Sequence, residues 1–174
     1  KALLDDMFGE TTYEKAECKM LSYAISKAIE NARLEEKDID VLISGDLLNQ
    51  IISASFAARD YEIPFLGVYG ACSTMALSLA AAAVCVDARI AEIAVASTSS
   101  HFCSAEKQFR MPLEYGGQRT PTAQWTVTGA GAFVLSGEDK ASPSLVYASV
   151  EEVFPGIVVE KGVKDAANMG AAMA

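Results

Sequence analysis

The fold is decided by the stretch FLGVYGACSTMALSLAAAAVCV, residues 65–86. Its first five residues, 65–69, form a short apolar run of strand length. Gly70 and Ala71 are small and allow the chain to turn tightly. Residues 72–86 are apolar almost all round, which is typical of a buried helix. The stretch therefore predicts a strand, a tight turn and a buried helix.

The same stretch has a second interpretation as a membrane span. Residues 63–86 carry no charge and are long enough to cross a bilayer. However, Pro64, Gly67 and Gly70 interrupt the first third, and the alanines that dominate the rest give little transfer free energy. We therefore favour the strand, turn and helix, and we expect no transmembrane segment in this chain.

Strands and helices alternate on both sides of this stretch. Apolar periodicity predicts helices at 13–33 and 47–61, a polar loop at 34–38, and short strands at 41–43 and 93–96. Such alternation is typical of parallel strands with helices on both faces of the sheet. Ligands bind beyond the carboxyl ends of these strands. The segments at those ends are Ser44-Gly45-Asp46, Tyr69-Gly70-Ala71-Cys72 and Ser97-Thr98-Ser99-Ser100-His101.

The pattern changes after the third strand. Residues 102–124 contain several prolines and glycines, which predict an irregular excursion long enough to be functional. Residues 127–135 and 144–153 predict two further strands, joined as a hairpin through residues 137–140. No internal repeat or linker divides the chain, so we expect one domain over residues 1–174.

The composition is that of a globular protein and argues against several functions. Of the 174 residues, 51% are hydrophobic and 21% are charged, and the formal net charge is -9. This negative charge repels phosphates, which argues against nucleic acid binding. Four cysteines without a CxxC pair, and a single histidine, argue against a metal site and a disulfide framework. We therefore expect free thiols in a reducing, cytosol-facing compartment.

Cys72 is the strongest candidate for chemistry. The predicted turn places its thiol at a helix N-terminus, where N–H groups and the helix dipole favour the thiolate. A thiolate there is a nucleophile suited to acyl transfer. From position alone, the alternative is a small buried residue in a packed turn. Cys85 is predicted to belong to the core, and Cys18 and Cys103 have no visible activating partner.

Other polar residues are candidates for the same end of the sheet. His101 follows a strand and could act as a general base if it reached Cys72, although a lone histidine in a loop is more often structural. Arg110 and Arg119 could bind an acidic small molecule through charge-assisted hydrogen bonds, or could be ordinary surface charges. Asp46 is interpreted as the N-cap of the second helix.

Six segments, taken in order, resemble one known family. They are Ser44-Gly45-Asp46-Leu47-Leu48-Asn49-Gln50, Phe65-Leu66-Gly67-Val68-Tyr69-Gly70-Ala71-Cys72-Ser73-Thr74, Ser99-Ser100-His101, Ala105-Glu106-Lys107-Gln108-Phe109-Arg110, Glu114-Tyr115-Gly116-Gly117-Gln118 and Thr126-Val127-Thr128-Gly129-Ala130-Gly131-Ala132. Together they resemble the stage V sporulation protein AD family of endospore-forming bacteria, a thiolase-fold family related to thiolases and ketoacyl synthases. The resemblance covers nearly the whole chain beyond its N-terminal segment.

The resemblance implies a fold and a nucleophile position. Thiolase-like subunits contain two related halves, each an α/β unit with a mixed five-stranded sheet and helices on both faces. This chain resembles the first half, without its opening strand and without the C-terminal half. Cys72 matches the nucleophilic cysteine of thiolases. Histidines from the second half activate that cysteine in thiolases, and His101 belongs to a different segment.

The resemblance also implies a function, which is binding rather than turnover. The expected ligand is dipicolinate, pyridine-2,6-dicarboxylate, and the expected partners are membrane proteins of the stage V sporulation A operon that load it into the spore. The expected ligand-binding residues are Cys72, His101, Arg110 and Arg119, with no cofactor. We expect a homodimer that pairs through residues 93–97 and lies peripherally on the cytoplasmic side of the forespore inner membrane.

Two other functions remain open at this point. One is an active acyltransferase or condensing enzyme that uses Cys72 as its nucleophile and coenzyme A thioesters as substrates. The other is a structural subunit that has lost its ligand.

Overall fold

Short apolar runs build the sheet at the centre of the molecule. The computed structural model describes residues 7–48, 50–109 and 127–137. The strands in these ranges are β1 (Val41–Asp46), β2 (Phe65–Gly67), β3 (Ile93–Ser100) and β4 (Gly129–Ser136), in the spatial order β2-β1-β3-β4. β1 runs parallel to β2 and to β3, whereas β4 runs antiparallel to β3. The carboxyl ends of β1, β2 and β3 therefore lie at the same end of the sheet.

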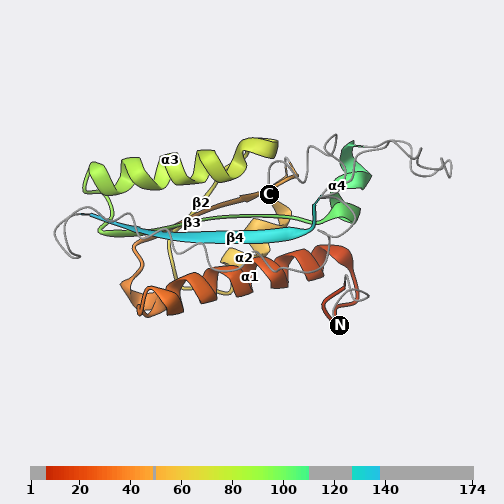
Figure 1. Ribbon diagram of the computed structural model, residues 1–174, viewed down its shortest axis with the longest axis horizontal. Helices are drawn as coiled ribbons and strands as arrows, with labels where there is room; N and C mark the ends of the chain where they lie inside the picture. Colours follow the sequence, from red (N-terminus) through yellow and green to blue (C-terminus); the bar gives the residue numbers. More distant parts are fainter. Residues whose placement is uncertain (1–6, 49, 110–126, 138–174) are drawn as a thin grey trace, which may run out of the picture.

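Helices cover both faces of this sheet, as the alternating pattern predicts (Figure 1). α1 (Tyr13–Asn31) and α2 (Ile52–Ala58) lie on one face, and α3 (Thr74–Asp87) lies on the other. α4 (Phe102–Phe109) follows β3 and lies at the end of the sheet where α1 begins. The expected α/β architecture is confirmed.

α1 forms where a capping residue precedes a helix with one apolar side. The Thr12 hydroxyl accepts a hydrogen bond from the Lys15 amide at 3.2 Å, which satisfies one free N–H group of the first turn. Beyond the last turn, Arg33 has a left-handed backbone with φ 58, a common helix ending. The buried residues of α1 are Ala16, Glu17, Met20, Leu21, Ala24, Ile25, Ala28 and Ile29. The helix predicted at 13–33 is thus confirmed apart from its C-terminal end.

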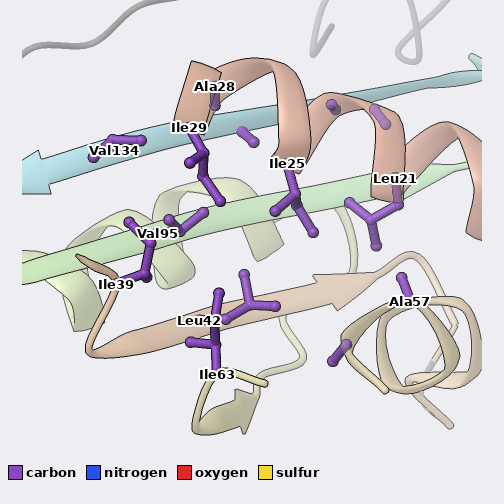
Figure 2. Close-up of a cluster of buried hydrophobic side chains, with 14 of the residues drawn as sticks. Leu21, Ile25, Ala28, Ile29, Ile39, Leu42, Ala57, Ile63, Val95 and Val134 are labelled. Atoms are coloured by element: carbon purple, nitrogen blue, oxygen red, sulfur yellow. The ribbon is translucent and has the colours of Figure 1, made fainter. Parts of the chain in front are cut away.

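The sheet separates two apolar clusters. The larger cluster lies between the sheet and the layer of α1 and α2. It includes Leu42 and Val95 of the sheet and Leu21 and Ile25 of α1 (Figure 2). The smaller cluster lies between the sheet and α3; its buried members are Ile43, Ala82, Ala94, Ala96 and Leu135. Successive strand residues point to opposite faces, so that the neighbours Leu42 and Ile43 belong to different clusters.

The predicted count of five strands is wrong for the described part of the chain, which forms four. That count came from the family, whereas the chain itself was expected to lack the opening strand. In the structure β1 pairs directly with β3, with Ser44 opposite Ser97, so that the sheet has no gap between them. The strand predicted at 144–153 and, beyond Gly137, the hairpin turn at 137–140 lie outside the described residues.

Two strands are longer than their apolar runs predict. β1 continues through residues 44–46 and β3 through residues 97–100, where the sequence becomes polar. Facing hydroxyls explain the extension, because Ser97 Oγ donates to Ser44 Oγ at 2.7 Å between two fully buried side chains. A hydroxyl that finds a partner within the sheet can be buried at little cost.

Two helical segments also differ from prediction. The helix predicted at 47–61 is restricted to α2, because Ile51 has a left-handed backbone, φ 53, and separates the helix from β1. The segment predicted as irregular, 102–124, begins with α4. The prolines and glycines on which that prediction rested all come after Phe109 and lie outside the described residues.

α3 is not buried on every side, contrary to expectation. Thr74, Ser78 and Ala82 form its buried stripe, whereas the side chains of Leu77 and Val84 are 40% and 64% exposed. An apolar pattern predicts apolar surroundings, but in this structure the sheet covers only one side of the helix. Neither α3 nor any other helix in the described ranges is long and apolar enough to cross a membrane.

β3 is an interior strand. Its residues 94–99 pair with β1 on one side and with β4 on the other. Its backbone donors and acceptors are therefore used within the sheet and are not available for edge-to-edge pairing with a second copy. In the described sheet the edges open to pairing belong to β2 and β4.

Candidate functional site: the Cys72 turn

The turn that contains Cys72 is held by short hydrogen bonds. The Ser73 amide and hydroxyl both donate to Gly70 O, at 2.9 and 2.7 Å. Thr74 Oγ1 donates to Ala71 O at 2.7 Å and accepts from Gly70 N at 3.2 Å. These bonds wind Ala71–Ser73 into one 3-10 turn, from which α3 continues. The predicted passage from strand to helix through a tight turn is confirmed.

Gly45 of β1 allows this turn to pack directly on the sheet. A Cβ atom at position 45 would lie 2.1 Å from Val68 O and 2.6 Å from Thr74 Cγ2. Only glycine fits such a close approach. Thr74 is itself buried, and its Oγ1 lies 3.5 Å from Asp46 O. The turn is therefore fixed against the carboxyl end of β1.

Ala71, the residue before Cys72, has a left-handed backbone with φ 48. This conformation costs a residue with a Cβ atom about 1–2 kcal/mol. The hydrogen bonds of Gly70, Ser73 and Thr74 maintain it. Strain of this kind is concentrated at functional sites, where the surrounding structure holds a reactive group in one place.

Cys72 itself is exposed, at the end of the sheet where open α/β sheets bind ligands. The alternative interpretation, a small residue buried in a packed turn, is therefore wrong. The thiol lies at the start of a helical segment, where N–H groups attract an anion. The arrangement can present either a nucleophile or hydrogen-bond donors to a molecule in solvent.

The other three cysteines are free thiols that are partly buried. Cys18 packs against the larger apolar cluster, and this burial raises the pKa of its thiol. Cys85 packs against the smaller cluster on α3, as predicted for a core residue. Cys103 lies in α4 rather than in a loop. Cys72 is the exposed one of the four and therefore remains the best candidate nucleophile.

His101 is fully buried among aromatic rings. Its ring centroid lies 5.0 Å from that of Tyr13 and 5.1 Å from that of Phe102, and its Nδ1 accepts a hydrogen bond from Cys103 N at 3.2 Å. Tyr13 belongs to α1, in the helix layer opposite α3 (Figure 1). These contacts hold the imidazole toward the α1 layer, and its side chain is not accessible to a ligand in this structure.

Asp46 caps α2 from a distance rather than from the N-cap position. Its Oδ1 accepts a hydrogen bond from Leu48 N at 2.9 Å, and its Oδ2 accepts one from Ala54 N at 3.0 Å. The N-cap position is occupied by Ile51, whose side chain makes no capping bond. Burial raises the pKa of Asp46, while the hydrogen bonds from Ala54 and Leu48 lower it. Asp46 thus holds the loop between β1 and α2.

Glu17 is a functional candidate that sequence reasoning missed. Its side chain is 1% exposed, and the hydroxyls of Ser99 and Ser104 donate to its carboxyl group. Burial raises the pKa of Glu17 to about 7; the Ser104 hydrogen bond opposes this rise and the charge of Asp46 adds to it. The available signal was spacing, because Glu17 falls on the buried side of α1, three positions before Met20.

Two predicted site residues cannot be placed. Arg110 and Arg119 lie outside the described residues. Within the described ranges, no three His, Cys, Asp or Glu side chains gather closely enough to hold a metal ion.

The fold is thiolase-like, as comparison with solved structures shows. The chain is similar to 3-oxoacyl-[acyl-carrier-protein] synthase III from Aquifex aeolicus VF5, with a TM-score of 0.51 and 18% identity over 70% of this chain and 39% of that one. It is also similar to the H285N form of OleA from Xanthomonas campestris, with a TM-score of 0.53 and 15% identity over 68% of this chain and 39% of that one. At these identities the likeness concerns the fold alone.

Sequence comparison identifies the family. The model of the family stage V sporulation protein AD matches residues 1–174. The chain is also 43% identical over 166 residues to stage V sporulation protein AD of Bacillus subtilis (strain 168). The chain therefore belongs to the stage V sporulation protein AD family. The match covers 95% of this chain and 47% of the Bacillus protein, so the chain spans about half the length of that relative.

Proposed function

We propose that the protein containing this chain binds dipicolinate, pyridine-2,6-dicarboxylate, and is the ligand-binding component of dipicolinate uptake during sporulation. Membership of the stage V sporulation protein AD family supports a role in sporulation. The observation that carries the proposal is the Cys72 turn, an exposed and rigid strand-to-helix turn at the carboxyl end of a sheet.

The chemistry of the ligand suits this turn. Dipicolinate is a flat aromatic ring with two carboxylates, which require N–H donors or cations. The helical segment that begins at Ala71 supplies N–H groups at its start. We propose that Arg110 and Arg119 add charge-assisted hydrogen bonds to the second carboxylate. His101 is proposed to have a structural role through its ring contacts with Tyr13 and Phe102 rather than to bind the ligand directly.

Calorimetric titration of dipicolinate into the full-length protein tests the proposal. We expect saturable binding that Cys72→Ser weakens, because the substitution changes the group at the centre of the turn. Cys85→Ser is the matched control, since Cys85 lies on α3, which follows the turn, and packs against the smaller cluster. Binding that is unchanged by Cys72→Ser would show that the ligand binds elsewhere than at the turn. The absence of heat from folded protein would reject dipicolinate as the ligand.

A second function, acyl transfer, is favoured by one observation. Cys72 is exposed and is preceded by the strained Ala71, which is a suitable arrangement for a nucleophile that must meet an acyl thioester. In that case the thiolate would attack the thioester carbonyl, a thioester to Cys72 would form, and coenzyme A would leave as the thiol. The protein would then use a coenzyme A thioester as substrate rather than bind dipicolinate.

Mass spectrometry of the full-length protein after incubation with acetyl-coenzyme A distinguishes the two functions. A covalent acetyl adduct that maps to Cys72 and is absent from Cys72→Ala would support acyl transfer. No adduct, together with dipicolinate binding, would support the binding function. A folded protein that shows neither would be a structural subunit.

The assembly and location of the protein are further parts of the proposal. We propose a homodimer that acts with membrane proteins of the stage V sporulation A operon, at the cytoplasmic side of the forespore inner membrane. Because β3 is an interior strand, the proposed dimer does not use edge-to-edge backbone pairing at residues 94–97. Light scattering on the full-length protein tests the dimer, and a mass that stays monomeric at every concentration would reject it.

A further inference from the structure

A single buried carboxyl group connects three elements at the carboxyl end of the sheet. Glu17 lies on α1, and its Oε1 accepts a hydrogen bond from Ser99 Oγ of β3 at 3.0 Å. Its Oε2 accepts one from Ser104 Oγ of α4 at 2.8 Å. All three side chains are nearly inaccessible to solvent. Glu17 therefore fastens the first turn of α4 to both the sheet and α1.

A third hydroxyl lies in the same site. Ser53 of α2 is buried, and its proximity lowers the pKa of Glu17. Its Oγ nevertheless makes no hydrogen bond of acceptable geometry among the described residues. We take its influence on Glu17 to be weaker than that of the two bonded serines. The site thus holds a hydroxyl that is positioned to respond when the carboxyl group changes its charge.

Titratable groups in the described residues act on Glu17 or respond to it, and Cys18 on its own helix is one, because the charge of Glu17 helps to raise its pKa. The bounds of α2, β3 and β4 contain no titratable side chain. β1 contributes Asp46, whose negative charge disfavours ionisation of Glu17. His101 precedes α4, and the sequence of α4 adds Cys103, Glu106 and Lys107.

The protonation state of Glu17 changes the free energy of keeping its carboxyl group buried. Burial is the main reason that Glu17 holds its proton up to a pH of about 7, compared with 4.5 for an ordinary glutamate. If α4 moved away and water entered, the carboxyl group would recover ordinary behaviour. Ionisation therefore favours the hydrated, open arrangement over the closed one, by the linkage between proton binding and conformation.

We propose that Glu17 is a protonation switch that holds the first turn of α4 on α1 and β3 when neutral and loosens it when ionised. The switch follows from one carboxyl group shared by three elements in a dry site. It is independent of the ligand proposed above, so failure of dipicolinate binding leaves it standing.

Hydrogen exchange of the full-length protein between about pH 5 and pH 9 tests the switch. After correction for intrinsic exchange rates, the amides of residues 102–105 are expected to open at least about tenfold more often above pH 7 than at pH 5. The amides of residues 79–86 in α3, on the other face of the sheet, are the internal control and are expected to show no such change.

Two variants test whether Glu17 causes the pH dependence of exchange. Glu17→Gln keeps the shape of the side chain without a titratable group, and it is expected to abolish the pH dependence at residues 102–105. Ser104→Ala keeps the carboxyl group and removes a hydrogen bond that lowers its pKa, so the midpoint is expected to move to higher pH. If Glu17→Gln does not fold, Ser104→Ala alone decides the direction.

Infrared spectroscopy reports the proton itself. A protonated carboxyl band that persists to near pH 7 and is missing from Glu17→Gln is the expected signature. The proposal is overturned if residues 102–105 show no pH-dependent opening, or if that dependence survives in Glu17→Gln. It is also overturned if Ser104→Ala leaves the pH midpoint of exchange unchanged. A wild-type carboxyl band that is already lost when the pH reaches about 5 would overturn it as well.

Discussion

Gly45 is the residue on which the geometry of the Cys72 turn depends most directly. Its Cα faces Val68 O and Thr74 Cγ2 so closely that a methyl group would overlap both. We expect Gly45→Ala to lower the free energy of unfolding by about 2 kcal/mol or more, because the backbone of the turn must move to admit the new atom.

Urea denaturation measures this effect, and Gly137→Ala is the matched control. Among the described residues, the nearest atom to a Cβ at position 137 would be Val86 Cγ1 at 3.7 Å, which is an ordinary contact. The control is expected to change stability by less than about 0.5 kcal/mol. Equal effects of the two substitutions would show that Gly45 does not determine how the turn packs.

Glu17 makes stability depend on pH in a definite direction. Its pKa is raised from 4.5 to about 7 in the folded protein, so between these values the folded state binds more protons than the unfolded state. The contribution is therefore fully present below pH 4.5 and is lost as the pH rises through about 7. The corresponding loss of free energy of unfolding is about 3 kcal/mol.

Urea titrations at several pH values between 4.5 and 8 measure this loss, with Glu17→Gln as the comparison. The difference in free energy of unfolding between wild type and variant isolates the glutamate from other titrating groups. We expect the wild type to fall relative to the variant across this range. A constant difference would show that the carboxyl group has an ordinary pKa.

At the scale of elements, an introduced lysine is expected to destabilise the protein on one side of α3 but not on the other. Val84 is 64% exposed, so Val84→Lys is expected to change the free energy of unfolding of this chain by less than about 0.5 kcal/mol. Ala82 is fully buried against the sheet, and Ala82→Lys is expected to cost about 3 kcal/mol or more. Thermal and urea unfolding compare the pair, and similar losses would mean that Val84 is covered.

The elements that sequence reasoning located correctly are those with a strong local signal. α1 has a Thr12 cap and regular apolar spacing, and β4 has an uninterrupted run from Gly129. The elements that it misjudged depend on partners far away in the chain. β3 extends to Ser100 because its serine hydroxyls find hydrogen-bond acceptors: Ser97 donates to Ser44 of β1, and Ser100 donates to the Val127 carbonyl. No local sequence pattern reveals such partners.

The candidate site could likewise be predicted only where neighbouring residues in the sequence determine it. Cys72 could be placed at a strand-to-helix turn because Gly70 and Ala71 are adjacent to it in the sequence. Its exposure could not be predicted, since an apolar helix was taken to be a buried one. The connection of Glu17 to Ser104 was also invisible, because it joins positions that only the folded sheet brings together.

At the scale of the whole molecule, the sheet should be most stable at its centre. β3 has a partner on both sides, whereas β2 is a three-residue edge strand whose residues are exposed. We expect the slowest amide hydrogen exchange in residues 94–97 and faster exchange by several orders of magnitude in residues 65–67. Native-state exchange measured by NMR provides the test, and equal protection of the two strands would contradict the strand order.

The strand order also has a consequence for how the chain is made. α1 packs against β4, although Asn31 and Ser136 are separated by 105 residues (136 − 31). At a synthesis rate of about 5–20 residues per second, the first helix leaves the ribosome roughly 5–20 seconds before the last strand that covers it. During that interval its apolar side has no native partner on β4. We therefore expect the apolar side of α1 to need protection, for example by chaperones, until β4 has been made.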